Sequence, residues 1–354
     1  MHSLRKQVSL LKGRFKQNEK LYGFFWGLPI FRKTMSVYHN RLGNHLKKEG
    51  LSRGKVIARA ADMVLSLWIY GCSYAEYNLY GFKDLRHRER RNYICDCCRK
   101  KYYAKLNSFA DTDCFRDKYL AYQAFRPYYK RNAFTYRVEE GFERFREIVE
   151  ICTEAMVKPA DASGGYGIMK VSAAEPEMLR QCFDKISRIA PDGDIIIEEY
   201  VHQASALKAL HPPSLNTARI ITVVDRAGIP HIIGTLFRIG KDGTVVDNGA
   251  SGGILCALSE DGTIQKSMDK KNNCFYKQHP NTGHPLVGFT IPRWSEAKAL
   301  ALELALEKPG IRYCGWDLAL TDDGWIMIEG NEGAELAGIQ IFGGGCKPSV
   351  ERYL

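Results

Sequence analysis

Two carboxylates and an amide lie close together near the end of the chain, on two apolar segments joined by a tight turn. Asp317 belongs to the first segment, and Glu329 and Asn331 belong to the second. On a β-hairpin, Asp317 and Glu329 would lie side by side, with Asn331 facing the same way. These oxygens are hard ligands that suit one or two Mg²⁺ ions held jointly with substrate phosphates. Like charges on paired strands need neutralising, which favours a metal site over a hairpin with one carboxylate in solvent.

A lysine and a glycine-rich segment earlier in the chain could bind phosphate. Lys158 ends a short apolar segment, and the following loop contains Ser163, Gly164, Gly165 and Gly167. Backbone N–H groups of such a loop can fold over an anion, and a fixed lysine adds positive charge. A purely structural hairpin loop is the alternative. The segment is not the loop of P-loop NTPases, because no Gly-Lys-Ser/Thr opens a following helix.

A third candidate lies between these two, where an apolar segment leads into adjacent carboxylates. Glu198 and Glu199 are followed by Tyr200 and Val201. Backbone groups at the edge of such a strand could hydrogen-bond to adenine, and a carboxylate could bind ribose hydroxyls. Taken alone, this segment has no specific meaning.

The elements that must position these residues change in type near residue 155. The first 150 residues are predicted to be mostly helical, with a helix over 58–82 ending near Gly81 and a break at Pro127. Beyond them, the pattern predicts strands and helices at 156–159, 168–171, 176–189, 195–201 and 295–306, the last helix with Ser295 as N-cap. Gly-containing turns at 225–228, 242–243 and 323–324 predict three hairpins. The C-terminal two thirds should therefore be α+β with antiparallel sheets.

The order of these features resembles the ATP-grasp superfamily, from about Asp117 to Glu335. Further stretches resemble the sugar-transfer-associated ATP-grasp family, which is usually linked to polysaccharide biosynthesis; they are 215–220, 248–253, 288–294 and 315–318. The resemblance implies an α+β, ATP-grasp fold of two subdomains that grip ATP, after a mostly helical N-terminal region. The expected parts are a basic amphipathic segment, a helical domain, a lid subdomain and a catalytic subdomain, at 1–60, 61–116, 117–201 and 202–354.

The resemblance also implies a role for each candidate residue. ATP phosphates would be bound by Lys118 and Lys158 and covered by a mobile loop with Ser163, Gly164, Gly165 and Gly167. Adenine and ribose would be held by Glu198, Glu199, Tyr200 and Val201, and two Mg²⁺ ions by Asp317, Glu329 and Asn331.

An arginine is also needed, because its permanently charged guanidinium binds planar oxyanions through two hydrogen bonds. Many related ligases carry one two residues before the metal-binding aspartate, where this chain has Gly315. Arg219, Arg293 or Arg312 must then supply the charge, and Arg219 is the candidate catalytic residue together with Lys158.

The implied reaction joins a small carboxylate to an amine, with an acyl phosphate and ADP formed on the way. The substrates would be sugar- or amino-acid-related, in polysaccharide or specialised biosynthesis. With an acceptor hydroxyl, the same site would make the protein a small-molecule or sugar kinase. A third possibility is a non-catalytic scaffold that binds glycans or membranes.

The net charge of +11 is unevenly distributed: residues 1–60 carry a net +12, and residues 151–354 a net −5. The basic character is therefore local, which argues against a nucleic-acid-binding protein. Aromatic residues at 21–31 lie between basic flanks, a pattern that suits contact with an anionic membrane or polyanion; packing against the rest of the protein is the alternative. With no secretory signal and no segment long enough to span a bilayer, we expect a cytoplasmic protein, peripheral at the inner face of the membrane.

The eleven cysteines are an odd number scattered along the chain, which indicates reduced thiols. Cys95 and Cys98 form a CxxC pair, but no second pair lies at zinc spacing. Whether these two cysteines bind a metal stays open.

Overall fold

The computed structural model describes residues 52–161, 166–243 and 252–354 of the chain. Its contacts define two compact units, residues 1–105 with 335–352, and residues 106–334 with 353–354. The domain boundaries expected from the sequence stay predictions. In the described residues, no helix is both long and apolar enough to cross a membrane.

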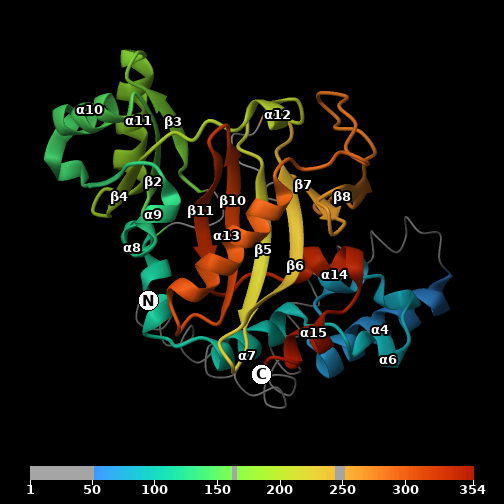
Figure 1. Cartoon of the computed structure of the whole chain (residues 1–354). Helices are drawn as coiled ribbons and strands as arrows, with labels where there is room; N and C mark the ends of the chain where they lie inside the picture. The colour runs from blue at the N-terminus through green and yellow to red at the C-terminus, as the bar shows by residue number, and fades with distance from the viewer. Residues whose placement is uncertain (1–51, 162–165, 244–251) are drawn as a thin grey trace, which may run out of the picture. The chain divides into compact units, whose positions relative to one another are not determined.

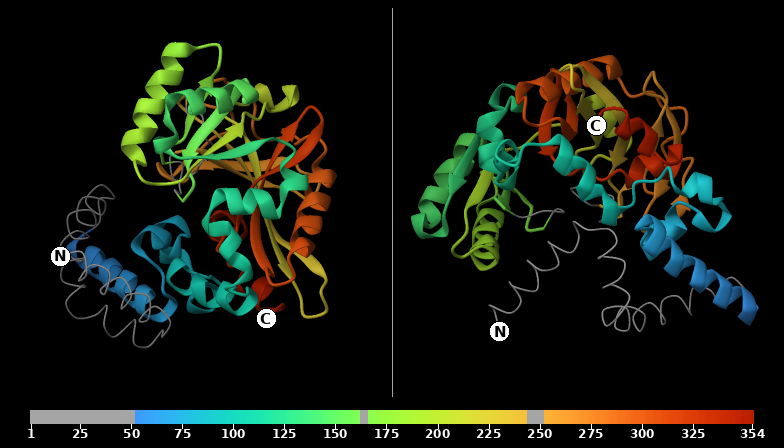
Figure 2. Two further views of the ribbon diagram at one scale, coloured as in Figure 1. Left: turned by 90° about the vertical axis from the view of Figure 1, so that its left-hand side faces the viewer. Right: turned by 90° about the horizontal axis from the view of Figure 1, so that it is seen from below.

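The first unit is helical in its described part (Figure 1). Its elements are α4 (Arg53–Tyr70), α5 (Tyr74–Leu79), η2 (Phe82–Asp84), α6 (His87–Arg90), most of α7 (Asp96–Leu106), α14 (Ala337–Gly343) and α15 (Lys347–Glu351). Aromatic residues of α5 and η2 form a core around the buried Phe82. The single helix predicted over 58–82 is wrong. The long blue helix α4 (Figure 2) ends at Tyr70, because Gly71 adopts a left-handed conformation with φ 67° and its N–H caps the last turn.

The second unit contains a four-stranded antiparallel sheet in the order β1-β4-β2-β3. The strands are β1 (Ala133–Tyr136), β2 (Glu154–Pro159), β3 (Met169–Ser172) and β4 (Ile195–Glu199). Helices α10 (Gly141–Cys152) and α11 (Pro176–Ile189) share a core with Val157 and Ile197. Because strand residues alternate between faces, Lys158 and Glu198 lie on the face turned away from these helices.

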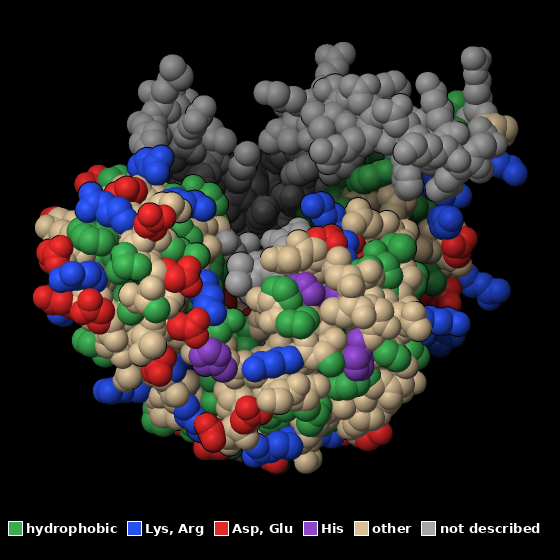
Figure 3. All heavy atoms as spheres, turned by 90° about the horizontal axis from the view of Figure 1, so that it is seen from above, with side chains coloured by type: hydrophobic (Ala, Val, Ile, Leu, Met, Phe, Trp, Pro, Cys, Tyr) green, Lys and Arg blue, Asp and Glu red, His purple; other side chains and the backbone are tan. Residues whose placement is uncertain are grey.

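Residues 83–150 are mostly helical, as expected, and strand β1 is an addition that the sequence did not predict. Its four residues pair with β4 and contain one β-branched residue, so the strand depends on a distant partner rather than on local propensity. The helix predicted over 176–189 is confirmed. Figure 3 shows basic and acidic side chains interspersed over the lobe at the left, which holds α10 and α11. Pairs such as Arg146 with Glu143 account for this pattern.

A seven-stranded antiparallel sheet follows, in the order β11-β10-β5-β6-β7-β8-β9. Its strands are β5 (Thr217–Val224), β6 (Pro230–Ile239), β7 (Ile254–Leu258), β8 (Ile264–Asp269), β9 (Cys274–Phe275), β10 (Tyr313–Thr321) and β11 (Gly324–Asn331). The predicted hairpins at 225–228 and 323–324 are confirmed as β5–β6 and β10–β11. The segment expected to pair after the turn at 242–243 lies outside the described residues.

Helix α13 (Trp294–Glu307) packs on one face of this large sheet. Its N-cap is Arg293 instead of the predicted Ser295, because Trp294 is buried at the start of the helix and the Arg293 carbonyl accepts a hydrogen bond from Trp325 Nε1 at 2.9 Å. The remaining elements of this unit are η3 (Asp111–Arg116), α8 (Lys118–Ala124), α9 (Arg126–Tyr129), η4 (Val138–Glu140) and α12 (Ser205–Lys208).

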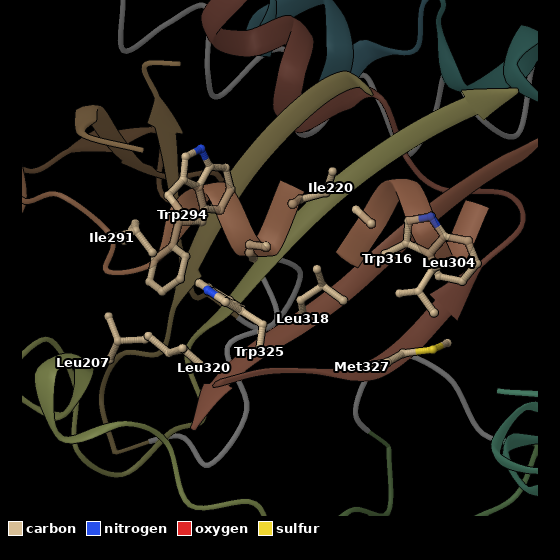
Figure 4. Packing of buried hydrophobic residues seen from close by; sticks show 14 of the residues in the cluster. Leu207, Ile220, Ile291, Trp294, Leu304, Trp316, Leu318, Leu320, Trp325 and Met327 are labelled. Carbon is tan, nitrogen blue, oxygen red and sulfur yellow. The ribbon is translucent and has the colours of Figure 1, made fainter. Parts of the chain in front are cut away.

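The core under the large sheet determines which way β10 presents its polar residue. Trp316, Leu318 and Leu320 alternate along β10 and are all buried in one cluster with Leu304 of α13 (Figure 4). Because neighbouring residues of a strand face opposite sides, Asp317 points away from this core.

Candidate active site

A row of charged side chains crosses three adjacent strands of the large sheet. Asp317 on β10 is paired with Glu329 on β11 and with Arg219 on β5. Residues directly opposite each other on paired strands share a face, so all three lie on the side away from Trp316. The pairing of Asp317 with Glu329 that the hairpin pattern predicted is therefore observed.

Asp317 is held by two arginines. Arg219 donates from Nε to Oδ1 and from Nη2 to Oδ2, the latter at 2.8 Å, and Arg238 Nη2 lies 2.9 Å from Oδ2. Burial alone would raise the pKa of this carboxyl, but the two guanidinium groups lower it. These arginines supply the neutralisation that the sequence argument assigned to a metal. The charge of Asp317 is therefore balanced within the described protein, and a metal is not needed for that balance.

Glu329 differs from its neighbour, because it is exposed to solvent and makes no hydrogen bond or ion pair with any described residue. Desolvation by the surrounding protein and the charge of Asp317 raise its pKa, while Lys158, Arg219 and Lys118 act in the opposite direction. Its carboxylate is thus accessible at its surface but surrounded by protein that opposes its ionisation. Glu329 is therefore an open position for a cation.

Asn331 lies two residues beyond Glu329 and pairs with Gly315 across the hairpin. Its Nδ2 is buried without a hydrogen-bond partner in the described chain. A buried amide without a partner is costly unless a ligand satisfies it. The two carboxylates and this amide offer oxygen donors, and Nδ2 can donate to a phosphate. These residues thus fit Mg²⁺ bound together with a phosphorylated ligand.

On the small sheet, Glu198 is the centre of a second charged cluster. Lys158 Nζ lies 2.7 Å from Oε1, and Arg131 Nη2 lies 2.8 Å from Oε2. Burial opposes ionisation, but the two cations lower the pKa of Glu198 to about 2. Both oxygens are occupied and the residue is only 5% exposed. Its side chain is therefore not the free ribose-binding carboxylate that the resemblance implied, and only its backbone remains for a nucleotide.

The next three residues of the predicted nucleotide segment lie in different surroundings. Glu199 Oε2 accepts a hydrogen bond from the Asn132 N–H at 3.1 Å and lines an open depression of about 520 Å³. The ring of Tyr200 lies 3.8 Å from Lys170 Nζ. Val201 is partly buried.

Lys118 is positioned by the start of α8, where Asp117 Oδ1 accepts hydrogen bonds from the backbone N–H groups of the first turn. Lys118 Nζ donates to the Ala160 carbonyl at 3.1 Å, just beyond Lys158 in the chain. Desolvation and the charge of Lys158 lower the pKa of Lys118, and Glu329 opposes this shift. The structure thus brings Lys118, Lys158 and Glu329 within electrostatic reach of one another.

The predicted loop is only partly described. Ser163, Gly164 and Gly165 lie outside the described residues. Gly167 has φ 71°, and a Cβ atom there would lie 3.0 Å from Pro159 Cδ. Glycine is thus required at the end of this loop by both conformation and space.

Among the three candidate arginines, only Arg219 belongs to this site. Arg293 forms an ion pair with Glu296, and Arg312 donates to the carbonyls of Val224 and Tyr353 at 2.9 and 3.0 Å. Gly315 is consistent with an arginine supplied from β5 instead of from this position. A Cβ atom on it would clash with Ala334 Cβ at 2.4 Å and would crowd Arg219 Cδ at 3.2 Å.

Two functional residues were missed at the sequence level. Arg238 could not have been found by counting outward from the 225–228 turn. A register shift between Ile221 and Thr222 is what pairs it with Thr217, on the same face as Arg219. Arg131 carried no signal either, since it lies before a strand that was not predicted. It links the two sheets by donating to the Met327 carbonyl at 2.8 Å as well as to Glu198.

Comparisons with known proteins give one family and a set of distant structures. The model of a family described as sugar-transfer associated ATP-grasp matches residues 98–352. Similar solved structures include a RimK domain ATP-grasp protein from Sphaerobacter thermophilus, with 10% identity and a TM-score of 0.42 over 69% of this chain and 70% of that one. The ATP-grasp ligase PsnB, complexed with a minimal precursor, has 14% identity and a TM-score of 0.42 over 80% and 75%. The D-alanyl-alanine synthetase A of Vibrio cholerae has 11% identity and a TM-score of 0.38 over 68% and 60%. No curated protein matches the chain.

Proposed function

Because the chain belongs to the sugar-transfer-associated ATP-grasp family, we propose that it is an ATP- and Mg²⁺-dependent ligase that joins a carboxylate to an amine. Its fold is the ATP-grasp fold, with antiparallel sheets, packed helices and a helical N-terminal region. The proposed substrates are small molecules related to sugars or amino acids, used in polysaccharide or specialised biosynthesis.

One observation carries this proposal: Glu329 has no cation in contact, although it lies opposite Asp317 and beside the unsatisfied amide of Asn331. A solvated surface carboxylate would have an unperturbed pKa, whereas that of Glu329 is raised by desolvation and by Asp317. A site of this kind is completed by a cation. In an ATP-grasp fold, that cation is Mg²⁺ bound to ATP.

The roles of the residues follow from their positions. Two Mg²⁺ ions would be held by Glu329, Asn331 and the lone pairs of Asp317 that accept no hydrogen bond from the arginines. When bound, these ions would neutralise the charge of the phosphates. Lys118 and Lys158 would contact phosphate oxygens from the small sheet, with Ser163, Gly164, Gly165 and Gly167 covering them. The segment Glu198–Val201 would hold adenine and ribose, through its backbone at Glu198.

The reaction would proceed in two steps. A carboxylate oxygen of the acceptor attacks the γ-phosphorus, the bond to the β,γ-bridging oxygen breaks, and an acyl phosphate and ADP result. The amine then attacks the acyl carbon, loses a proton and displaces inorganic phosphate. Arg219 uses Nε and Nη2 for Asp317, which leaves Nη1 to stabilise the tetrahedral oxyanion.

The test is a screen of ADP release by the full chain over pooled carboxylates, amino acids, uronic acids and nucleotide sugars. The proposal requires that ADP release depend on a carboxylic acid and an amine together, and that Glu329→Gln slow it by about 10²–10³-fold. A phosphorylated product without an amide would establish the sugar or small-molecule kinase instead. If isothermal titration showed no binding of Mg-ATP, the protein would instead be the non-catalytic scaffold that binds glycans or membranes.

The basic N-terminal segment supports a second, separable proposal: peripheral attachment of a cytoplasmic protein to an anionic membrane, with no role in nucleic-acid binding. Residues 1–60 carry a net charge of +12, whereas residues 151–354 carry −5. Sedimentation with anionic liposomes should be lost on deleting residues 1–60 and should weaken with salt. Equal sedimentation of the truncated and full chains would refute it.

A further inference from the structure

Three buried side chains of the first unit offer ligand atoms to one point. These residues are Cys72, Glu76 and Cys95, whose ligand atoms all lie within 4.8 Å of one another. Cys72 is 1% exposed, Glu76 7% and Cys95 0%. Two thiols and a carboxylate at such distances are either packed together as neutral groups or bound to a common ion.

Glu76 distinguishes this cluster from ordinary core packing. The other buried carboxylates of the described chain all have cationic partners: Glu198 has Lys158 and Arg131, Asp317 has Arg219 and Arg238, and Asp269 has Lys241. Glu76 accepts hydrogen bonds from the Ser73 and Asp96 N–H groups at 2.9 and 2.7 Å and from Tyr80 Oη at 3.3 Å. No described Lys, Arg or His contacts it. A buried carboxylate without a cation is costly, and a metal ion would remove that cost.

The backbone around the cluster brings the thiols together from distant positions in the sequence. Cys72 directly follows Gly71, whose left-handed conformation ends α4. Cys95 directly precedes α7, and its carbonyl accepts a hydrogen bond from the Cys98 N–H at 2.8 Å. This tight CxxC turn folds Cys98 back toward Gly71, where a Cβ atom would lie only 2.6 Å from Cys98 Sγ. Cys98 Sγ itself lies outside the group of ligand atoms within 4.8 Å and donates to the Tyr70 carbonyl at 3.6 Å, so it would have to turn toward Cys72 and Cys95 to become a ligand.

We propose that Cys72, Glu76 and Cys95 bind one structural zinc ion, with Cys98 as the fourth ligand. Zinc is the expected metal because it is borderline-soft and four-coordinate, and it accepts both thiolates and carboxylates. Mg²⁺ and Ca²⁺ require oxygen ligands throughout, so they do not suit this set. Binding replaces the thiol protons, which pass to solvent. The ion would hold the segment before α7 against the end of α4 and against α5.

This site is independent of the proposed reaction. Cys72, Glu76 and Cys95 precede residues 98–352, the range that the family model matches, so nothing in the family match implies them. The CxxC pair alone was inconclusive in the sequence, because Cys72 lies 23 positions before Cys95 and its proximity depends on the fold.

The test is the metal content of the full chain, purified under reducing conditions without chelator and measured by inductively coupled plasma mass spectrometry. About one zinc per chain is expected. Cys72→Ser and Cys95→Ser should lose the metal, and Glu76→Gln, which keeps the shape of the side chain, should bind it more weakly. Cys182→Ser is the matched control, because Cys182 is also buried but lies in α11. This variant should retain the zinc.

Two wild-type measurements keep the test decisive if a variant fails to fold. Substitution with cobalt should produce the intense thiolate-to-cobalt charge-transfer absorption of a tetrahedral sulfur site. Intact mass under non-reducing conditions should show free thiols. No metal after incubation with zinc, unchanged metal content in Cys72→Ser, or a Cys72–Cys95 disulfide would each overturn the proposal.

Discussion

The two sheets of the second unit each hold a buried carboxylate between two cations, but the carboxylates that follow differ. Glu198 lies between Lys158 and Arg131, and Asp317 lies between Arg219 and Arg238. Beside Glu198, the next carboxylate, Glu199, accepts a backbone N–H hydrogen bond. Beside Asp317, Glu329 has no partner in the described chain.

This difference separates carboxylates that serve the structure, such as Glu198, from Glu329, which is proposed to serve the reaction. In the small sheet, two positive charges face one negative charge, and the positive excess suits phosphate. In the large sheet, the same arrangement is followed by a second carboxylate that needs a cation. The small-sheet cluster therefore has an excess positive charge, whereas the two arginines of the large-sheet cluster are balanced by Asp317 and Glu329. The two ion-paired clusters around Glu198 and Asp317 would not by themselves indicate an active site, because buried carboxylates with cationic partners also occur for structural reasons. Glu329 is what distinguishes the large sheet.

The largest effect should come from removing the charge of Glu198. Glu198→Gln leaves Arg131 and Lys158 buried without a counter-charge, and should lower the free energy of unfolding by about 3–5 kcal/mol. Glu199→Gln is the matched control on the same strand, and should cost about 1 kcal/mol at most. Chemical denaturation measures both. Equal losses would show that the two carboxylates do not differ as described.

The next effect should be on activity. Glu329→Gln should lower the rate of ADP release by about 10²–10³-fold, the usual effect of losing one group that stabilises the charged transition state. Without ATP and Mg²⁺, the same variant should be at least as stable as the wild type, because its carboxylate is repelled by Asp317. Activity assays and thermal denaturation check the two parts. A strong loss of stability would instead place Glu329 in a structural role.

A smaller effect is expected at the position that admits the arginine. Gly315→Ala places a Cβ atom 2.4 Å from Ala334 Cβ and should lower the free energy of unfolding by about 1–3 kcal/mol. Gly54→Ala, with nothing within 4 Å of the added atom, should be neutral or slightly stabilising. The comparison is made by denaturant titration of both variants. If Gly315→Ala is as stable as the wild type, the crowding around Arg219 is not as described.

The smallest effect concerns pH, where the two carboxylates act with opposite sign. The pKa of Glu198 is lowered to about 2 from an ordinary 4.5, so its contribution is complete above pH 4.5 and is lost as the pH falls toward 2. The pKa of Glu329 is raised, so stability falls as the pH rises from 4.5 through that pKa. Unfolding free energies measured against pH should lose the first slope in Glu198→Gln and the second in Glu329→Gln. Identical profiles for the two variants would contradict the assignment.

Local patterns predicted those parts of the fold that depend on neighbouring residues. The helix from Pro176 and the β10–β11 hairpin follow from a local period and a two-residue turn. The pairing of Asp317 with Glu329 also needs a β-bulge, because a regular hairpin from this turn would place Asp317 opposite Ile328. The end of α4 at Gly71 was missed, because a lone glycine is compatible with either a helix or a cap.

The parts of the site that were missed depend on residues distant in sequence. Strand β1 and Arg131 are positioned by β4 and β11, more than 60 residues away. The neutralisation of Asp317 depends on Arg219, 98 positions earlier. Residue types alone could show that charges had to be balanced, but not which groups balance them.

Gly315 and Arg219 together also have a consequence for how such chains are recognised. A search pattern written along one strand would require an arginine two residues before the aspartate, and this chain would fail it. A pattern written across the sheet, from β10 to β5, would accept it, because the guanidinium occupies the space that Gly315 leaves open. In this chain the pattern is therefore read across two paired strands, with the aspartate on β10 and its arginine on β5.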